Sequence, residues 1–218
     1  MAQVFRPRSN TIALAIIVGG LLFLAALVYG TYAVWDSPYM TRVNIPQDQP
    51  VQFSHEHHVA GLGIDCRYCH TSVETESFAG MPPTETCMTC HSQVWVDAPM
   101  LAPVRQSLAR QMPLQWNRVN DLPDFVYFDH AIHVQRGVAC VTCHGRVDQM
   151  PLMWKATTQY MQWCLDCHRN PAPYLAPREQ VFNLGWTSPS NQLQLGQQRM
   201  REANIDPDQI TNCSACHH

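Results

Sequence analysis

The sequence is poor in charge and contains no run of basic residues. Of its 218 residues only 14% are charged, with 14 Lys and Arg against 17 Asp and Glu, which gives a formal net charge of −3. Without a basic cluster, nothing points to nucleic acid or to an anionic lipid surface as a partner. Charge is missing altogether between Ser9 and Trp35, although hydrophobic residues make up 46% of the chain. This uncharged stretch indicates a segment that lies in a membrane.

The stretch predicts a transmembrane helix over residues 11–35. It exceeds the roughly 20 apolar residues that cross a bilayer. A cleaved signal peptide is the alternative, but its apolar region of about 7 to 15 residues would end at small residues, whereas this one continues to Trp35. Arg6 and Arg8 precede it, so the positive-inside rule predicts a signal anchor with residues 1–10 in the cytoplasm and the remaining chain on the periplasmic side of the cytoplasmic membrane.

No cysteine stands outside one repeated motif, Cys-x-x-Cys-His. In an exported chain ten cysteines would ordinarily indicate five disulfides. Two Cys-x-x-Cys pairs about 17 residues apart also suit a zinc ribbon. Neither alternative calls for a histidine after every pair. The ten cysteines are Cys66, Cys69, Cys87, Cys90, Cys140, Cys143, Cys164, Cys167, Cys213 and Cys216.

The motif is an attachment signature for c-type haem. Its two thiols form thioether bonds to the porphyrin, and the adjacent imidazole becomes the proximal ligand of the iron. Five copies therefore predict five covalently bound haem c groups. The expected proximal ligands are His70, His91, His144, His168 and His217.

Histidines outside the motifs reveal an internal duplication. The segment "VQFSHEHHV" at 51–59 aligns without gaps on "VYFDHAIHV" at 126–134, and two motifs follow each copy. The repeats span residues 51–91 and 126–168, and the fifth motif, 213–217, follows them.

Four of these histidines are candidate distal ligands. The shared pattern Phe-x-His-x-x-His resembles the small tetrahaem cytochromes c of sulfate-reducing bacteria. In that family the first histidine serves the haem immediately downstream, and the second reaches a different haem. The resemblance implies the pairs His55 with His70 and His130 with His144. It assigns His58 and His133 to two of the three haems at Cys87, Cys164 and Cys213.

One haem of five is then left without a distal ligand. His57 is not expected to serve, because Ile132 takes its place in the second repeat. Met150 is the favoured ligand, and Met153 and His218 are the alternatives. A Met/His haem has a higher reduction potential than a bis-histidine one.

Little outside the apolar helix predicts a conventional core. Prolines are frequent, strand alternation is scarce, and only residues 103–112 and 190–203 have a helical pattern. Five haems would supply the missing apolar bulk and restrict the unfolded chain. The expected fold is one N-terminal transmembrane α-helix, a linker over 36–50, and a loop-rich, mainly α/irregular multihaem cytochrome c domain with an internal duplication over 51–218.

No motif predicts catalysis. The sequence shows no Ser/His/Asp, Cys/His or paired-carboxylate arrangement, and an iron with two protein ligands leaves no position for a substrate. We therefore expect an electron-transfer subunit of an oxidoreductase without a catalytic site of its own. A stand-alone quinol dehydrogenase feeding periplasmic reductases, or a multihaem terminal reductase if one haem is five-coordinate, are the alternatives.

Two stretches carry a closer resemblance, "FSHEHHVAGLGIDCRYCHTSVETESFAGMPPTETCMTCHSQVW" and "QYMQWCLDCHR". They resemble the pentahaem cytochrome c subunit of bacterial alternative complex III, a quinol:acceptor oxidoreductase of respiratory and photosynthetic chains. The resemblance covers nearly the whole chain. It implies as partners an iron–sulfur subunit, polytopic quinol-binding subunits and a separate monohaem cytochrome c, with quinol oxidised outside this subunit.

Overall fold

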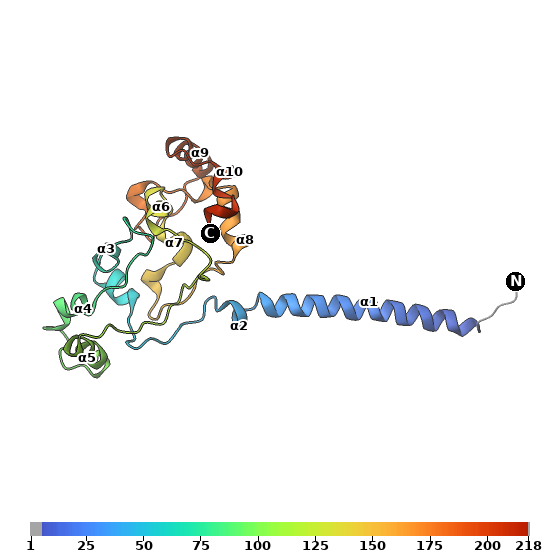
Figure 1. The fold of residues 1–218 in the computed structure, drawn as a ribbon, viewed down its shortest axis with the longest axis horizontal. Coiled ribbons are helices and arrows are strands. Elements are labelled where there is room, and N and C mark those ends of the chain that lie inside the picture. Colours follow the sequence, from blue (N-terminus) through green and yellow to red (C-terminus); the bar gives the residue numbers. More distant parts are fainter. Residues whose placement is uncertain (1–5, 218) are drawn as a thin grey trace. The chain divides into compact units, whose positions relative to one another are not determined.

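The computed structural model describes residues 6–217, and the chain divides into two compact units, Met1–Arg42 and Val43–His218 (Figure 1). Residues 6–217 contain no strand, only three isolated β-bridges, so the predicted helical and irregular fold is confirmed. The elements are α1 (Pro7–Trp35), α2 (Pro38–Thr41), η1 (Glu56–Gly61), α3 (Cys66–Cys69), α4 (Thr84–His91), η2 (Pro99–Leu101), α5 (Ala102–Arg110), α6 (His130–Gln135), α7 (Cys140–His144), η3 (Val147–Gln149), α8 (Met161–Arg169), η4 (Ala172–Tyr174), η5 (Arg178–Gln180), α9 (Gln192–Glu202), α10 (Pro207–Ile210) and η6 (Cys213–Ala215).

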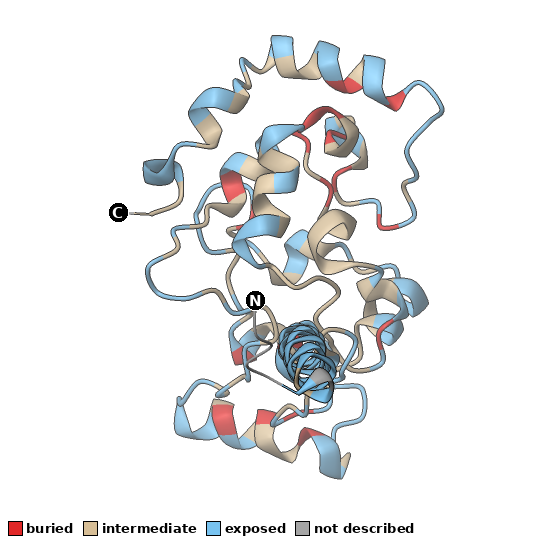
Figure 2. Ribbon diagram, turned by 90° about the vertical axis from the view of Figure 1, so that its right-hand side faces the viewer, coloured by how far each residue is buried: buried red, intermediate tan, exposed pale blue. Residues whose placement is uncertain are grey.

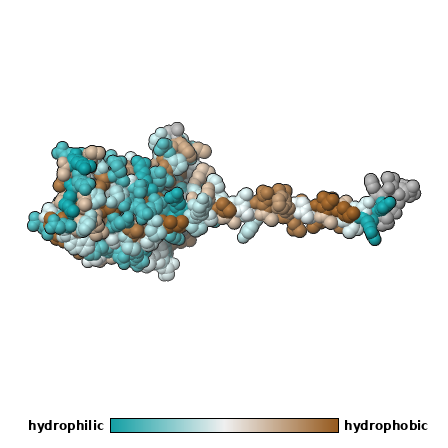
Figure 3. All heavy atoms as spheres, turned by 90° about the horizontal axis from the view of Figure 1, so that it is seen from below, coloured by the Kyte–Doolittle hydropathy of each residue, from teal (hydrophilic) through white to brown (hydrophobic). Residues whose placement is uncertain are grey.

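Helix α1 dominates the first unit. It begins at Pro7, a position that suits proline because the first helical N–H has no partner within the helix. Its large apolar side chains, from Ile12 to Trp35, are exposed, and they form the brown stretch in Figure 3. Its 29 residues at about 1.5 Å each extend about 43 Å, beyond the hydrocarbon core of about 30 Å. The segment Arg8–Thr41 is long and apolar enough to cross a membrane, a test that a signal sequence also passes.

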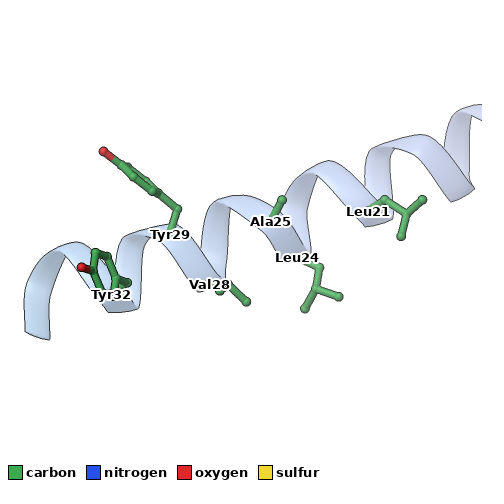
Figure 4. A pocket seen from close by; sticks show the side chains of 6 residues that line it. All are labelled: Leu21, Leu24, Ala25, Val28, Tyr29 and Tyr32. Carbon is green, nitrogen blue, oxygen red and sulfur yellow. The ribbon is translucent and has the colours of Figure 1, made fainter. Parts of the chain in front are cut away.

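The side chains of α1 leave shallow spaces on the helix surface. Figure 4 shows one of them, next to the two tyrosine rings near the end of the helix. Because a single helix supplies the whole lining, the space is a feature of an unpartnered surface and not a binding cavity. The lining residues are Leu21, Leu24, Ala25, Val28, Tyr29 and Tyr32.

The first residues of the second unit are held by hydrogen bonds, although they lie in the stretch expected as a linker. Asn44 N–H donates to the Lys155 carbonyl at 2.8 Å, and Gln47 N–H donates to the Met153 carbonyl at 3.1 Å. Pro46 keeps this stretch extended, which lets it pair with residues 153–155. The paired residues are thereby attached to the second repeat.

Buried apolar residues in the second unit form two small clusters. Figure 2 shows all buried residues, these among them, as short, scattered stretches of red. A motif cysteine packs against each cluster: Cys87 against Val51, Leu101 and Val104, and Cys140 against Val73, Val134 and Val181. Burying one such aliphatic side chain contributes about 1.5–3 kcal/mol. Clusters of this size are small for a domain of this length, and haem as the additional core material stays a prediction.

The two helices predicted outside the motifs, at 103–112 and 190–203, are confirmed as α5 and α9. Helix α5 supports α4, which contains the second motif. The Thr84 hydroxyl contacts Ser107 Oγ at 2.6 Å, and Ser107 donates its own hydrogen to the Met112 carbonyl. Thr84 is therefore the donor in the buried contact between the two helices.

Helix α9 lies close against η4. A Cβ at Gly196 would overlap the Ala172 carbonyl, so only glycine permits this approach. Gln192 Nε2 donates to the carbonyls of Ala172 and Leu175 at 3.1 and 2.8 Å, and Arg199 Nη1 donates to the Leu175 carbonyl at 2.7 Å. These bonds satisfy carbonyls that the short turn η4 leaves without helical partners.

Candidate functional site

Each Cys-x-x-Cys-His motif forms a short helical turn, in α3, α4, α7, α8 and η6 respectively. Positions i, i+3 and i+4 share one side of such a turn, so the two thiols and the imidazole lie together. Asp65 caps α3 by accepting from the Arg67 N–H at 2.8 Å, and Asn212 caps η6 by accepting from the Ser214 N–H at 3.2 Å. Local hydrogen bonds therefore shape these attachment sites.

None of the ten cysteines takes part in a disulfide within the described residues. All ten lie within the described residues and are free thiols. Burial, followed by neighbouring thiols, raises the pKa of Cys140 and Cys143 to about 12 and that of Cys167 to about 11. These thiols are protonated at neutral pH. Within residues 6–217, no group of three His, Cys, Asp or Glu side chains converges as for a metal ion.

Three pairs of histidine rings are neighbours at nearly equal separations, with interplanar angles of 62° for His58 and His91, 7° for His130 and His144, and 28° for His133 and His168. Each pair joins a candidate distal histidine to the histidine of a motif. The ring centroids are 6.2 Å apart for His58 and His91, 6.4 Å for His130 and His144, and 6.0 Å for His133 and His168.

These separations are compatible with one iron held between the two imidazoles of each pair. With a metal–nitrogen bond of about 2 Å and a ring radius of about 1.1 Å, two opposed rings would have centroids about 6.2 Å apart. All three observed values lie within a few tenths of an ångström of that distance. The donor set is also that of a bis-histidine haem.

Backbone carbonyls orient seven of the nine candidate ligand histidines. In each, the Nδ1–H donates to a carbonyl, which leaves Nε2 unprotonated and available to a metal. For the motif histidines the bonds are His70 to Gly80 at 2.7 Å, His91 to Val94 at 3.1 Å, His168 to Ile210 at 2.8 Å and His217 to Phe125 at 3.0 Å. For the distal candidates they are His58 to Ser54 at 2.8 Å, His130 to Ser77 at 2.9 Å and His133 to Asp129 at 2.6 Å.

Burial keeps several of these imidazoles neutral. Desolvation, followed by the nearby His70, lowers the pKa of His55 to about 4, and desolvation, followed by the nearby His130, lowers that of His144 to about 4. Burial likewise lowers the pKa of His58 and of His133. The neutral imidazole is the form that binds metals.

His55 contributes a further sign of a missing bond. Its Nδ1 is buried without a hydrogen-bond partner. Leaving a buried polar group unpaired costs about 1–3 kcal/mol, and His55 lacks the orienting carbonyl that seven of the other candidate ligands have. Because His55 also lies near His70, this position fits the same donor set.

With this geometry in view, the chain can be compared with known proteins. Residues 33–101 match the model of the class III cytochrome c family, a segment that includes the first two motifs, His55 and His58. This part of the chain is therefore similar to class III cytochromes c. Class III cytochromes hold haem c covalently, which agrees with the fit of the cysteines and histidines.

One relative has a related domain over a longer stretch. The multihaem cytochrome c subunit of menaquinone reductase from Nitratidesulfovibrio vulgaris is 36% identical over 122 residues. The aligned region covers 56% of this chain and 55% of the relative. The chain therefore spans about half the length of that cytochrome.

The two repeats of the cytochrome domain share one local geometry, with a phenylalanine ring packed against both histidines. The centroid distances and interplanar angles in the first repeat are 4.9 Å and 90° for Phe53 and His55, and 4.4 Å and 29° for Phe53 and His58. In the second they are 4.7 Å and 89° for Phe128 and His130, and 4.5 Å and 28° for Phe128 and His133. The backbone differs, since η1 is π-helical and α6 is α-helical.

The histidine without a counterpart in the second repeat has a different contact. The His57 ring stacks on Trp95, with centroids 6.2 Å apart and an interplanar angle of 19°. Both residues are exposed. His57 therefore faces an aromatic side chain and not the histidine of a motif.

The fifth motif has its own surroundings. The His217 ring lies beside the Phe125 ring, with centroids 5.8 Å apart. Met150 is 1% exposed, Met153 is half-buried, and His218 lies outside the described residues. The identity of the fifth distal ligand stays a prediction, with Met150 favoured over Met153 and His218.

Sequence reasoning did not identify the carbonyls that orient the histidines. Backbone groups carry no side-chain signal, and the best available clue is a glycine. Gly80 has a φ of +83°, a conformation that glycine adopts without strain, and its carbonyl accepts from His70. The contact of 2.8 Å between the Tyr68 hydroxyl and Thr89 Oγ1, which joins the first two motifs, was equally inaccessible.

Proposed function

We propose that this chain relays single electrons between quinol-reactive subunits of a membrane complex and a one-electron acceptor, through five haems attached at its five motifs. The observation that carries the proposal is the set of three histidine ring pairs separated by 6.0 to 6.4 Å. Two protein ligands per iron leave no position for a substrate, which favours a relay over a reductase.

The residues of this chain have distinct tasks in the relay. The ten cysteines anchor the cofactors, and the histidines supply Nε2 lone pairs. Carbonyls that accept from Nδ1–H prevent ring rotation and make Nε2 more basic. When bound, haem c supplies an iron that gains or loses one electron while its ligands stay in place.

Helix α1 is proposed as an uncleaved anchor, with its N-terminus in the cytoplasm and the cytochrome domain on the periplasmic side. The length of 29 residues supports an anchor. Arg6 and Arg8 lie at the start of the helix and its last turn has no acidic or basic side chain, which supports the orientation. Alkaline extraction of membranes should leave the chain in the membrane fraction. Recovery of a soluble chain shortened at its N-terminus would identify α1 as a signal sequence.

The finer proposal is the pentahaem subunit of an alternative complex III. The stretches quoted above resemble that subunit, and the relative from Nitratidesulfovibrio vulgaris is named as part of another quinone-linked reductase. The proposed partners are an iron–sulfur subunit, polytopic quinol-binding subunits and a monohaem cytochrome c. Since a relay of this kind can carry electrons in either direction, the partner subunits would set the direction, here from quinol to the acceptor.

The test is reduction by quinol. The complex extracted with detergent should contain the other subunits, and a short-chain quinol should reduce all five haems in it. The separated chain should carry five haems by mass and should not be reduced by quinol. Rapid reduction of the separated chain would instead support a stand-alone quinol dehydrogenase, and a substrate-binding five-coordinate haem in the untreated protein would support a terminal reductase.

A further inference from the structure

We propose that the five motifs form a single row in the order second, first, third, fourth, fifth, so that electrons enter and leave the domain at the second and fifth motifs. The proposal rests on the relay function above. The order in space would thus differ from the order in the sequence, with the first motif in the interior of the row.

The first and second motifs are neighbours. The Tyr68 hydroxyl of the first motif contacts Thr89 Oγ1 of the second at 2.8 Å. The adjacent His55 and His58 connect the same two motifs, because the His58 ring lies 6.2 Å from that of His91 in the second motif, and His55 is the proposed partner of His70 in the first.

The first and third motifs meet where the two repeats join. Cys140 packs against the cluster that contains Val73, which follows the first motif. The same segment, Val181 and Phe182, touches both motifs: the Val181 carbonyl accepts from the Cys140 N–H at 3.0 Å, and the Arg67 guanidinium lies 4.6 Å from the Phe182 ring centroid.

Helix α6 adds a second connection between the repeats. Its Ala131 N–H donates to the Glu76 carbonyl at 3.2 Å, and its Gln135 side chain donates to the Glu74 carbonyl at 2.9 Å. Both acceptors lie just after the first motif. The helix that carries two candidate ligands of the second repeat is thus docked on the first repeat.

The third and fourth motifs are connected by α6 itself. His130 and His133 lie one turn apart on this helix, and they face His144 of the third motif and His168 of the fourth. This repeats the connection between the first two motifs.

The fourth and fifth motifs meet through the C-terminal helices. Helix α8, which contains the fourth motif, packs on α10, which directly precedes the fifth. The His168 Nδ1–H donates to the Ile210 carbonyl of α10 at 2.8 Å.

These contacts produce one row because the repeats meet through their leading motifs. The second motif then lies outside the first, and the fourth lies outside the third. At each step one electron leaves the reduced centre at one motif and reduces the oxidised centre at the next, and no covalent bond forms or breaks. The donor is a quinol-oxidising partner and the acceptor is a one-electron carrier.

Two variants of the full chain in its complex distinguish this order from the sequence order. His58→Met and His55→Met should each convert one haem to Met/His ligation and raise its potential, so that it is reduced first in a titration. A reduced low-spin haem is diamagnetic, so its magnetic coupling to adjacent ferric haems disappears. Electron paramagnetic resonance then counts how many of the remaining ferric signals change when that haem is reduced. We expect one altered neighbour for His58→Met and two for His55→Met. The reverse result, two and one, would overturn the proposal.

A matched control and a second measurement keep the test decisive. His57→Met, which alters an exposed histidine whose ring contacts that of His58, should convert no haem to Met/His ligation and should leave the order of reduction unchanged. If the variants lose haem, the iron positions in an electron cryomicroscopy map of the wild-type complex decide the order. An iron at His91 lying between those at His70 and His144 would contradict it. Quinol reduction is measured separately, so a failed order and a failed function give different results.

Discussion

The imidazole planes of His130 and His144 are parallel to within 7°, with centroids 6.4 Å apart, although the two rings are positioned by different repeats. His144 belongs to the third motif, whereas the His130 Nδ1–H donates to the Ser77 carbonyl of the first repeat. The relative orientation of these two rings therefore depends on how the repeats dock on each other.

The facing rings of His133 and His168 predict the effect of removing one ligand. His133→Ala should leave one haem in five without a distal imidazole, because the ring centroids of His133 and His168 are 6.0 Å apart and His133 is the proposed distal ligand of that haem. Electron paramagnetic resonance should then detect one high-spin haem, and added imidazole should restore the low-spin signal. His57→Ala serves as the control and should remain low-spin. An unchanged spectrum for His133→Ala would remove His133 from the ligand set.

Two glycines with positive φ allow the cost of backbone strain to be measured separately from the cost of a steric clash. Gly63 has a φ of +68° with open space around its Cβ position, whereas Gly80 has a φ of +83° and a Cβ there would lie 2.8 Å from Ser72 Oγ. Gly63→Ala should cost about 1 kcal/mol in unfolding free energy from strain alone. Gly80→Ala should cost about 2–3 kcal/mol, because the hydroxyl must also move and the carbonyl that orients His70 shifts with it. Denaturant titration of the haem-containing protein measures both, and equal losses would contradict this account.

The close approach of α9 to η4 predicts a stability loss where helix propensity predicts a gain. Alanine is favoured over glycine inside a helix by about 1 kcal/mol, but a Cβ at Gly196 would overlap the Ala172 carbonyl. We expect Gly196→Ala to destabilise the protein by about 1–3 kcal/mol, because backbone must move. Leu193→Ala, at an exposed position of the same helix, should change stability by less than about 0.5 kcal/mol. Thermal unfolding in parallel tests both, and a stabilised Gly196→Ala variant would refute the close packing.

The pair of Asp65 and Arg67 predicts a small, pH-dependent contribution. The side-chain hydrogen bond from Arg67 is the main cause that lowers the pKa of Asp65 from 3.8 to about 2. The stabilisation is therefore fully present above about pH 4 and is lost as the pH falls towards 2. Asp65→Asn retains an N-cap but removes the charge, and because the pair is half exposed the loss at pH 7 should be below about 1 kcal/mol. The difference from wild type should shrink at pH 2 and in high salt, and a difference that grows on acidification would contradict the assignment.

The sequence predicted the parts of the fold that repeat or that carry strong local patterns. The long apolar run, the helices at 103–112 and 190–203, and the duplication of Phe-x-His-x-x-His all have counterparts in the structure. These features can be predicted from the sequence because helix formation and the geometry of a short histidine turn depend on residues that are close in the chain.

Contacts between residues distant in the sequence could not be predicted in the same way. The sequence left His58 and His133 to be shared among three motifs, and the structure brings them to face His91 and His168. That choice depends on packing between distant segments, such as α8 on α10, which no local pattern encodes. The carbonyl acceptors were missed for the same reason, since Ile210 reaches His168 only after both helices have docked.

The two residues between the cysteines of a motif take no part in attaching haem, yet here they differ in purpose from copy to copy. Arg67 lies against Phe182, and Tyr68 bonds to Thr89, the corresponding residue of the second motif. Transplanting "CSAC" into the place of "CRYC" would preserve the chemistry of attachment and remove both contacts. The residues between the cysteines thus make contacts that are specific to one copy. The five motifs share one pattern, but they are not interchangeable within the fold.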